Sequence, residues 1–349
     1  MLLAGSLATT RPFHMGFTQW PADLTAEGVA KSVNFANAHG DLISVMFIGG
    51  IPWDASLSGG KYSADVDKNL AYRPPAGKKL FLSISPLDQS RAALAPNWGE
   101  KDNQPLSSKW MGKALDDPDV VGAFTNFALR SVAAMKPDYL AIGIESNVLL
   151  SKNPAKWEQW KRLHQATYRA VKAKNPDLPI FFTVEVNHFL KNAAEAKESD
   201  QIGQVKEMLP FEDIFAMSLY PHMANQIPRP FPSNYLDFAR QFKKPIAISE
   251  SGMTSADVKL KSFGLTLHGS EEEQKLFVER VLGIAARDKY SFVVNFATTD
   301  FEALCKRLPP PADDIGRIWS LTGLQTADGK AKPALKSWDT ALAQSFRRD

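Results

Sequence analysis

Two glutamates stand at the ends of apolar segments, where a carboxylate can do acid–base chemistry. Glu145 closes the run Tyr139-Leu-Ala-Ile-Gly-Ile-Glu145, and Glu250 closes the run Pro245-Ile-Ala-Ile-Ser-Glu250. An ionised carboxylate is costly to bury, so each of them needs either a partner or a function. Two carboxylates in one site titrate apart, because like charges resist ionising together. One can then donate a proton while the other attacks, which is the requirement of retaining glycoside hydrolysis at a separation of about 5 to 5.5 Å.

The competing interpretation of these glutamates is structural. Each carboxylate could simply pair with an Arg or a Lys of the same fold, as buried carboxylates commonly do. That interpretation is weaker for both residues together than for either one alone. The sequence therefore favours a catalytic pair, and the elements that carry the two residues decide whether they can meet.

These elements belong to a repeating pattern of short apolar runs. Eight runs rich in β-branched and aromatic residues alternate with polar or helical stretches, which is typical of a parallel sheet covered by helices. They cover residues 13–19, 42–48, 79–85, 139–145, 180–186, 214–219, 245–250 and 292–297. We predict an α/β fold, a single (β/α)8 TIM barrel over residues 13–349, with long loops after strands two and three. Glu145 and Glu250 then follow strands four and seven, on the face where barrel active sites lie.

The alternative fold is an open, doubly wound sheet. Neither a GxGxxG nor a GxxxxGK[ST] phrase, the phosphate-binding loops that often accompany that fold, occurs in the chain. Between the runs, Asn153 before Pro154 predicts a capped helix, and Ser270 with Glu273 predicts a capping box ahead of another. Weaker helical patterns cover residues 25–38, 118–135, 234–242 and 333–346.

Composition narrows the class of protein. The chain has 349 residues, 44% hydrophobic and 23% charged, which excludes a disordered chain. Its single cysteine, Cys305, excludes an internal disulfide and iron–sulfur or zinc-ribbon sites. A formal charge of +3 with interspersed signs argues against a nucleic-acid partner, and no apolar run approaches the about 18 to 20 residues of a membrane span. Residues 1–12 are expected to be a disordered N-terminus or the remnant of a leader, which favours a secreted or periplasmic location.

Several motifs resemble clan A glycoside hydrolases, a superfamily of retaining (β/α)8 enzymes. The run ending in Glu250 is similar to the nucleophile strand of that clan, residues 213–221 resemble its strand six, and residues 323–338 resemble the segment before its last helix. The family 53 endo-galactanases and the family 5 type enzymes are the nearest by this resemblance. It implies a glycosidase without a cofactor or metal, with Glu145 as general acid and base and Glu250 as nucleophile.

The same resemblance suggests residues that hold the sugar. Tyr220, after strand six, is expected to hydrogen-bond the nucleophile and keep it ionised, with His222 beside it. Trp20 and Trp53, after strands one and two, are either sugar platforms or loop anchors. We expect a monomer that acts on an oligosaccharide or polysaccharide, with no nucleic-acid or membrane partner.

The sequence also departs from the clan pattern. Ile144 stands where most members have an Asn that contacts the sugar 2-hydroxyl, so Asn147 is expected to take over that contact. Strand eight, in the run Asn295-Phe-Ala-Thr-Thr-Asp300, lacks the usual Trp. These departures leave open a barrel that binds sugar without cleaving it.

Strand five offers a rival to Glu145. Alternation along a strand places Glu185 and Asn187 on one face and His188 on the other. Glu185 and Asn187 are therefore expected to bind the substrate, and Glu185 is also a second candidate for the catalytic role. A less favoured alternative is a metal-dependent amidohydrolase-type barrel using His14, His188, His222 and Asp300. His164 within a helix and His39 at a helix end are expected to be structural.

Overall fold

The computed structural model describes residues 10–347, so the first nine residues of the predicted N-terminal segment lie outside the described part. Thr10–Arg11 forms the short strand β1, which pairs in parallel with β13 (Ser345–Phe346). Contacts divide the described chain into two compact units. The first comprises the chain up to Ile43, Leu219–Gln241 and the chain from Pro245 onward; the second comprises Ser44–Ser218 and Phe242–Lys244.

All eight predicted strand regions form strands. These are β2 (His14–Thr18), β3 (Leu42–Phe47), β4 (Lys79–Ile84), β5 (Tyr139–Ala141), β6 (Ile180–Phe181), β7 (Thr183–Glu185), β8 (Phe215–Leu219), β9 (Ile246–Ser251) and β12 (Phe292–Asn295). The sheet order is β6-β5-β4-β3-β2-β12-β9-β8-β7. The fifth region supplies both ends of this order, because it divides at Phe182 into β6, which pairs with β5, and β7, which pairs with β8. The fold is therefore a nearly closed parallel (β/α)8 barrel, as predicted, and not an open doubly wound sheet.

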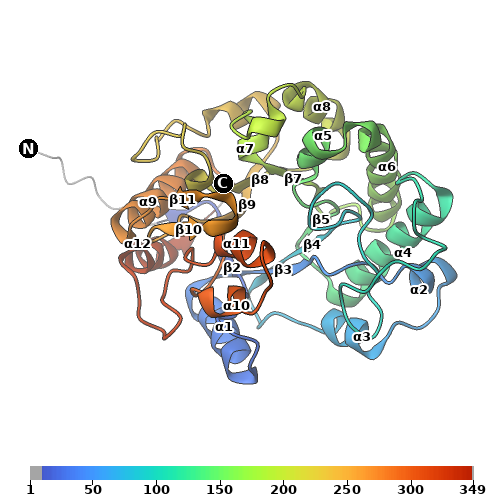
Figure 1. Ribbon diagram of the computed structural model, residues 1–349, viewed down its shortest axis with the longest axis horizontal. Helices are drawn as coiled ribbons and strands as arrows, with labels where there is room; N and C mark the ends of the chain where they lie inside the picture. The colour runs from blue at the N-terminus through green and yellow to red at the C-terminus, as the bar shows by residue number, and fades with distance from the viewer. Residues whose placement is uncertain (1–9, 348–349) are drawn as a thin grey trace, which may run out of the picture. The chain divides into compact units, whose positions relative to one another are not determined.

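Helices cover the strands of each unit. In the first unit, α9 (Glu271–Arg287) packs beside α12 (Pro333–Leu342), and α1 (Ala26–His39) follows β2. In the second unit, α4 (Pro118–Met135) lies beside α6 (Trp157–Lys174) (Figure 1). The predicted N-cap at Ser270 is confirmed, because its hydroxyl accepts a hydrogen bond from the Glu273 backbone N–H at 3.2 Å. The Glu273 carboxylate accepts from Arg229 Nη1 at 3.1 Å, so it does not complete the predicted capping box among the described contacts.

Three predicted helix boundaries were wrong. Asn153 does not cap α6: its side chain donates to Ala92 O at 3.2 Å, and residues 154–156 form a 3-10 turn before the helix begins at Trp157. The pattern over residues 234–242 yields only a 3-10 helix, Asp237–Phe242. The pattern over residues 333–346 ends as α12 at Leu342 and is followed by β13.

The long loops after strands two and three are anchored by tryptophans. Trp53 begins the short helix α2 (Trp53–Ser58), is fully buried, and donates its indole N–H to Ala95 O at 3.0 Å. Trp98 likewise donates to Asp65 at 2.7 Å. Trp53 is therefore a loop anchor and not a sugar platform, because neither face of its ring is open to a sugar.

The single cysteine lies in a covered place. Cys305 ends the short helix α10 (Glu302–Cys305), and its side chain is buried. Burial raises the pKa of its thiol to about 11. Within residues 10–347, no helix is long and apolar enough to cross a membrane.

Candidate active site

Glu250 lies near the carboxyl end of β9, between two buried serines. Ser249 and Ser251 are almost fully covered, whereas Glu250 is partly exposed. Gly252 lets Thr322 and the Phe296 carbonyl approach the backbone closely, because a Cβ there would lie 2.8 Å from Thr322 Cβ and 2.9 Å from Phe296 O. The strand thus presents one carboxylate at a crowded strand end.

Tyr220 contacts this carboxylate. It follows β8 directly, its side chain is buried, and its hydroxyl donates to Glu250 Oε1 at 2.5 Å. The predicted bond between Tyr220 and Glu250 is therefore present. A hydrogen bond from a phenol to a carboxylate favours the ionised carboxylate, which is the form that can attack an electrophilic carbon.

We expect Tyr220→Phe to lower kcat by about 10- to 100-fold, since a hydrogen bond to a charged group contributes about 1.5–3 kcal/mol. Steady-state kinetics on any substrate that the protein turns over would check this. Tyr168→Phe is the matched control, because Tyr168, on α6, likewise donates its hydroxyl to a carboxylate, that of Asp213, at 3.0 Å. A Tyr220→Phe rate equal to that of the control would contradict an activating role for the hydroxyl.

Aromatic rings surround Tyr220 in the first unit. The Trp319 ring lies 6.0 Å from it between centroids, and the Phe296 ring lies 6.5 Å from it. Trp20 packs against Phe296 at 5.6 Å. Trp20, Phe296 and Trp319 are all partly exposed. Phe296 thus stands at the end of strand eight, the position at which this sequence lacks the usual Trp. Trp319 comes from the segment after α11 (Ala312–Arg317), and it was not predicted from the sequence as a site residue.

His222 has a different role from the one predicted. It is almost fully buried, and its Nε2 lies 2.9 Å from Ile318 O, directly before Trp319. Burial lowers the pKa of His222 to about 4, so the ring is neutral near pH 7. The prediction that His222 contacts substrate is wrong in this structure, because its side chain is covered and holds the Trp319 segment.

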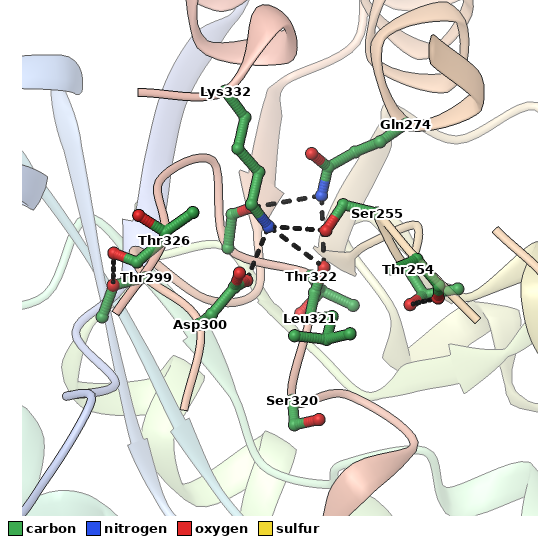
Figure 2. Close-up of polar contacts among 12 residues, drawn as sticks. Thr254, Ser255, Gln274, Thr299, Asp300, Ser320, Leu321, Thr322, Thr326 and Lys332 are labelled. Carbon is green, nitrogen blue, oxygen red and sulfur yellow. Dashed lines mark hydrogen bonds and ion pairs between the residues drawn. The ribbon is translucent and has the colours of Figure 1, made fainter. Parts of the chain in front are cut away.

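A buried lysine holds the next part of the same segment. Lys332 Nζ donates to Asp300 Oδ1 at 2.6 Å, to Ser255 Oγ at 2.8 Å and to Gly323 O at 2.9 Å (Figure 2). Gln274 from α9 adds a bond to Gly323 O at 3.1 Å. Burial raises the pKa of Asp300 to about 6 and lowers the pKa of Lys332, and their ion pair opposes both shifts. This network fixes residues 320–323, which continue from Trp319.

We expect Lys332→Met to lower the free energy of unfolding by about 3–5 kcal/mol, because it leaves Asp300 buried without its counter-charge. Chemical denaturation would measure the loss. Lys79→Met is the control: the Lys79–Asp138 pair is exposed by 45% and 33%, and such pairs contribute about 0–1 kcal/mol. Equal losses in both variants would show that Lys332 is not a structural centre.

Glu145, in the second unit, lies on a turn rather than on a strand. β5 ends at Ala141, and Glu145 has a left-handed backbone with φ of 50°. Its N–H donates to Thr183 Oγ1 at 2.8 Å. Gly143 makes the turn possible, because a Cβ there would lie 2.5 Å from Ser146 Oγ. The predicted strand end was therefore four residues too late, yet Glu145 remains beyond the carboxyl end of strand four.

The Glu145 carboxylate is paired. Its Oε2 lies 3.0 Å from Arg91 Nη2, and the two side chains are 16% and 13% exposed. Arg91 comes from the loop after β4 and was not predicted as a site residue. The partner Arg that the structural interpretation of Glu145 expects is thus present.

Asn147 does not face a ligand. It is fully buried; its amide donates to Glu185 O at 3.0 Å and to Gln201 Oε1 at 2.9 Å, and its Oδ1 accepts from Glu185 N at 2.8 Å. The prediction that Asn147 contacts the sugar 2-hydroxyl is wrong, because its side chain is fully buried and its amide group is bonded to Glu185 and Gln201. Asn147 instead ties the turn after Glu145 to the end of β7.

Glu185 caps a helix. The helix α7 (Val186–Phe189) begins directly after it, so the predicted alternation of Asn187 and His188 on a strand is wrong. The Glu185 carboxylate accepts from the backbone N–H groups of Asn187 at 3.0 Å and His188 at 2.7 Å, and contacts His188 Nδ1 at 2.5 Å. Burial disfavours a charged His188, but Glu185 outweighs it and the pKa of His188 is raised. Glu185 and Asn187 are buried, which favours a structural role for both.

The other histidines have protein partners. His14 Nδ1 lies 3.0 Å from Asp41 Oδ2, and His39 Nδ1 lies 2.7 Å from Asp339 Oδ1 at the end of α1. His164 is buried with its Nε2 2.6 Å from Glu212 Oε1, and burial lowers its pKa to about 4. Within the described part of the chain, no group of three or more His, Cys, Asp or Glu residues is arranged to hold a metal ion.

Comparison with known proteins identifies a family whose model matches this chain and solved structures that share its fold. The model of "Glycosyl hydrolase family 53" matches residues 97–293, more than half of the chain. The match covers the segments that carry both glutamates and Tyr220. No curated protein matches the chain.

Solved structures share the fold at low sequence identity. A GH5_18 protein from Streptomyces cattleya in complex with Manb1-4GlcNAc is 16% identical with a TM-score of 0.63, covering 95% of this chain and 79% of that one. The exo-beta-1,4-mannosidase Op5Man5 from Opitutaceae bacterium strain TAV5 is 14% identical with a TM-score of 0.64, covering 99% and 62%. A beta-glucuronidase from Bifidobacterium dentium, complexed with coumarin-3-O-glucuronide, is 15% identical with a TM-score of 0.54; the alignment covers 97% of this chain and about half, 48%, of that one.

Proposed function

The chain belongs to glycosyl hydrolase family 53, and from that premise we propose that it cleaves a β-linked oligosaccharide or polysaccharide with retention of anomeric configuration. Glu250 is the nucleophile and Glu145 the general acid and base. The observation that carries the proposal is the 2.5 Å hydrogen bond from the Tyr220 hydroxyl to Glu250 at the end of β9. Position on the barrel supports it further, because Glu145 and Glu250 follow strands four and seven.

The proposed reaction has two displacements. In the first, Glu250 attacks the anomeric carbon, the bond from that carbon to the leaving oxygen breaks, and Glu145 gives its proton to that oxygen. In the second, Glu145 takes a proton from water, and the water oxygen displaces Glu250 from the glycosyl-enzyme. Each step is balanced by these two carboxylates and one water, so the reaction needs no redox partner or cofactor.

A substrate screen with product stereochemistry tests the proposal. We would incubate the protein with β-glucans, galactans, mannans and xylans and read the anomer of the first product by NMR. β-Mannosides belong in the screen because one structural neighbour is named an exo-beta-1,4-mannosidase and another is in complex with Manb1-4GlcNAc. A β-anomer as first product is expected, and an α-anomer would contradict the retaining mechanism.

Sugar binding without cleavage is the second candidate function. Ile144 replaces the expected Asn, and the paired state of Glu145 keeps its carboxylate engaged with Arg91. A non-catalytic barrel would bind oligosaccharides in calorimetry and release no product after prolonged incubation. Product formation by the wild type but not by Glu250→Gln would exclude it.

A further inference from the structure

The long loop after β4 carries an open hollow with a volume of about 630 Å³. Its lining includes the polar residues Gln89 and Asn103 and the apolar residues Leu94, Leu106 and Met111. All of them belong to the second unit, as does Glu145. The hollow is therefore part of the same loop that supplies Arg91 to the Glu145 carboxylate.

Backbone hydrogen bonds fix the walls of this hollow. One wall is the turn over residues 86–95, in which the Asp88 N–H donates to Ala93 O at 3.0 Å. Another part of the wall is held at Asn103, whose N–H donates to Gly49 O at 2.6 Å, directly after β3. A concave surface that is already formed can bind a ligand without a further cost of ordering the loop.

The lining of the hollow suits the two kinds of surface on a sugar ring. Met111 is 63% exposed and, with Leu94 and Leu106, offers an apolar surface. The side-chain amides of Gln89 and Asn103 are exposed and bond no other group among residues 10–347. A pyranose has C–H groups on its faces and hydroxyl groups around its edge. An apolar surface beside amides, which both donate and accept, is complementary to such a ring.

The charge of the lining favours a neutral ligand. Asp88 is the one charged side chain among the described lining residues, and no lysine or arginine is among them. The Asp88 carboxylate accepts from the N–H groups of Ala92 and Ala93, each at 3.1 Å, and from the Ser90 hydroxyl at 2.8 Å. An anionic ligand would find no counter-charge in the hollow, so we expect a sugar without a charged group.

Arg91 connects the hollow to the proposed general acid. Its guanidinium donates through Nη1 to Asp88 O and to Gln89 O, each at 3.3 Å. Its Nη2 lies 3.0 Å from Glu145 Oε2. One guanidinium thus separates the backbone of the hollow from the Glu145 carboxylate. Because a general acid must contact the leaving oxygen, the leaving portion of the substrate begins beside this turn.

We propose that the hollow binds a neutral sugar residue in the leaving portion of the substrate, beyond the residue that is attached to the bond being cleaved. This inference rests on the function proposed above and adds to it a binding site away from the reacting atoms. The hollow acts by binding alone, so the rate depends on the length of the saccharide on the leaving side of the bond.

Substrates of increasing length test the proposal. We would use oligosaccharides, labelled at the reducing end, of the neutral polysaccharide that the substrate screen identifies. An aryl glycoside of the same sugar has no sugar in its leaving group and gives the reference rate. The size of the labelled product gives the number of residues on the leaving side. For the wild type, we expect kcat/KM to rise by about 10-fold once the leaving portion reaches the hollow, the effect of one or two neutral hydrogen bonds.

Two variants remove parts of the hollow. Met111→Ala removes apolar surface, and Asn103→Gly removes an amide. The Asn103 backbone has a φ of 53°, which glycine adopts readily, so the second variant keeps the loop conformation. On a long oligosaccharide, each variant should lower kcat/KM by about 3- to 10-fold, chiefly through KM. The loss on the aryl glycoside should be several times smaller.

Ile202→Ala is the matched control. Ile202 lies on α8 (Gln201–Met208), is 36% exposed and does not line the hollow. Its replacement removes exposed apolar surface elsewhere in the second unit, so the dependence of kcat/KM on substrate length should stay as in the wild type.

Each other outcome overturns a defined statement. Equal kcat/KM for short and long leaving portions in the wild type, or variants that lose equally on the oligosaccharide and the aryl glycoside, would overturn the role of the hollow and leave the glycosidase function standing. Variants that bind the polysaccharide more weakly but cleave oligosaccharides like the wild type would also overturn it, because the hollow would then be a separate surface site. No product from any saccharide, with a folded protein, would overturn both proposals together.

Discussion

Replacing Glu250 with glycine is expected to lower kcat by about 10⁴-fold or more, because removing a covalent nucleophile takes away the first displacement itself. The glycine leaves a space where the carboxylate stood. A small anion such as azide or formate can enter that space and attack the anomeric carbon of an aryl glycoside from the same side. We therefore expect millimolar azide to restore measurable release of the aryl alcohol, with an α-glycosyl azide as product.

Glu250→Gln is the control for this rescue. It keeps the shape of the side chain and an oxygen that can accept from Tyr220, so it should lose activity without being rescued. Circular dichroism and thermal unfolding would establish that both variants are folded. A Glu250→Gly protein with wild-type turnover would remove Glu250 from the mechanism.

Replacing Glu145 with alanine is expected to give losses that depend on the leaving group. Substrates with a poor leaving group need protonation and should lose about 10²–10⁴-fold in kcat/KM, the usual contribution of a general acid. A 2,4-dinitrophenyl glycoside needs almost no protonation and should lose far less. The alkaline limb of the pH–rate profile, which reports the acid, should disappear for the poor leaving group.

Two further variants keep this test specific. Glu145→Gln preserves an acceptor for Arg91, so it separates the loss of the proton donor from the loss of the ion pair. Glu185→Gln tests the rival candidate on strand five. Because Glu185 caps α7, its replacement should lower the rate on both substrates alike. Equal losses on both leaving groups in Glu145→Ala would assign the acid role elsewhere, with Glu185 examined first.

Much of the fold could be predicted because barrel strands carry a strong local signal. Buried parallel strands are apolar throughout, so all eight regions were recognisable from the sequence. Their ends were harder to predict. The run 139–145 remains apolar past Ala141, but the chain turns there because Gly143 packs against Ser146 and Phe182, a contact that periodicity does not contain.

The site was predictable where one strand end meets the next. Glu250 and Tyr220 follow neighbouring strands, β9 and β8, and their hydrogen bond could be expected from that position. The failures concern side chains whose role depends on a distant partner. Asn147 bonds Gln201, and His222 bonds Ile318, 54 and 96 residues away along the chain.

Arg91 and Trp319 were missed for a related reason. Both lie outside the strands, on segments whose shape depends on hydrogen bonds to loops and helices rather than on a repeating pattern. A basic residue shortly after strand three could have been noted as a partner for a strand-end carboxylate. Nothing in the sequence distinguishes Trp319 from the other tryptophans of the chain.

Cys305 gives the protein a built-in reporter of local opening. The thiolate is the reactive form of cysteine, and burial with a pKa of about 11 makes this side chain doubly unreactive while the segment is closed. Cys305 is buried in a cluster with Phe301 and Ala297, against which Trp20, Phe296, Leu304 and Trp319 pack, so a thiol reagent reaches it only when this cluster opens. As the chain has one cysteine, the rate of labelling reads that opening directly, with no background thiols to remove. Slower labelling in the presence of a saccharide would then show that the saccharide stabilises the closed cluster.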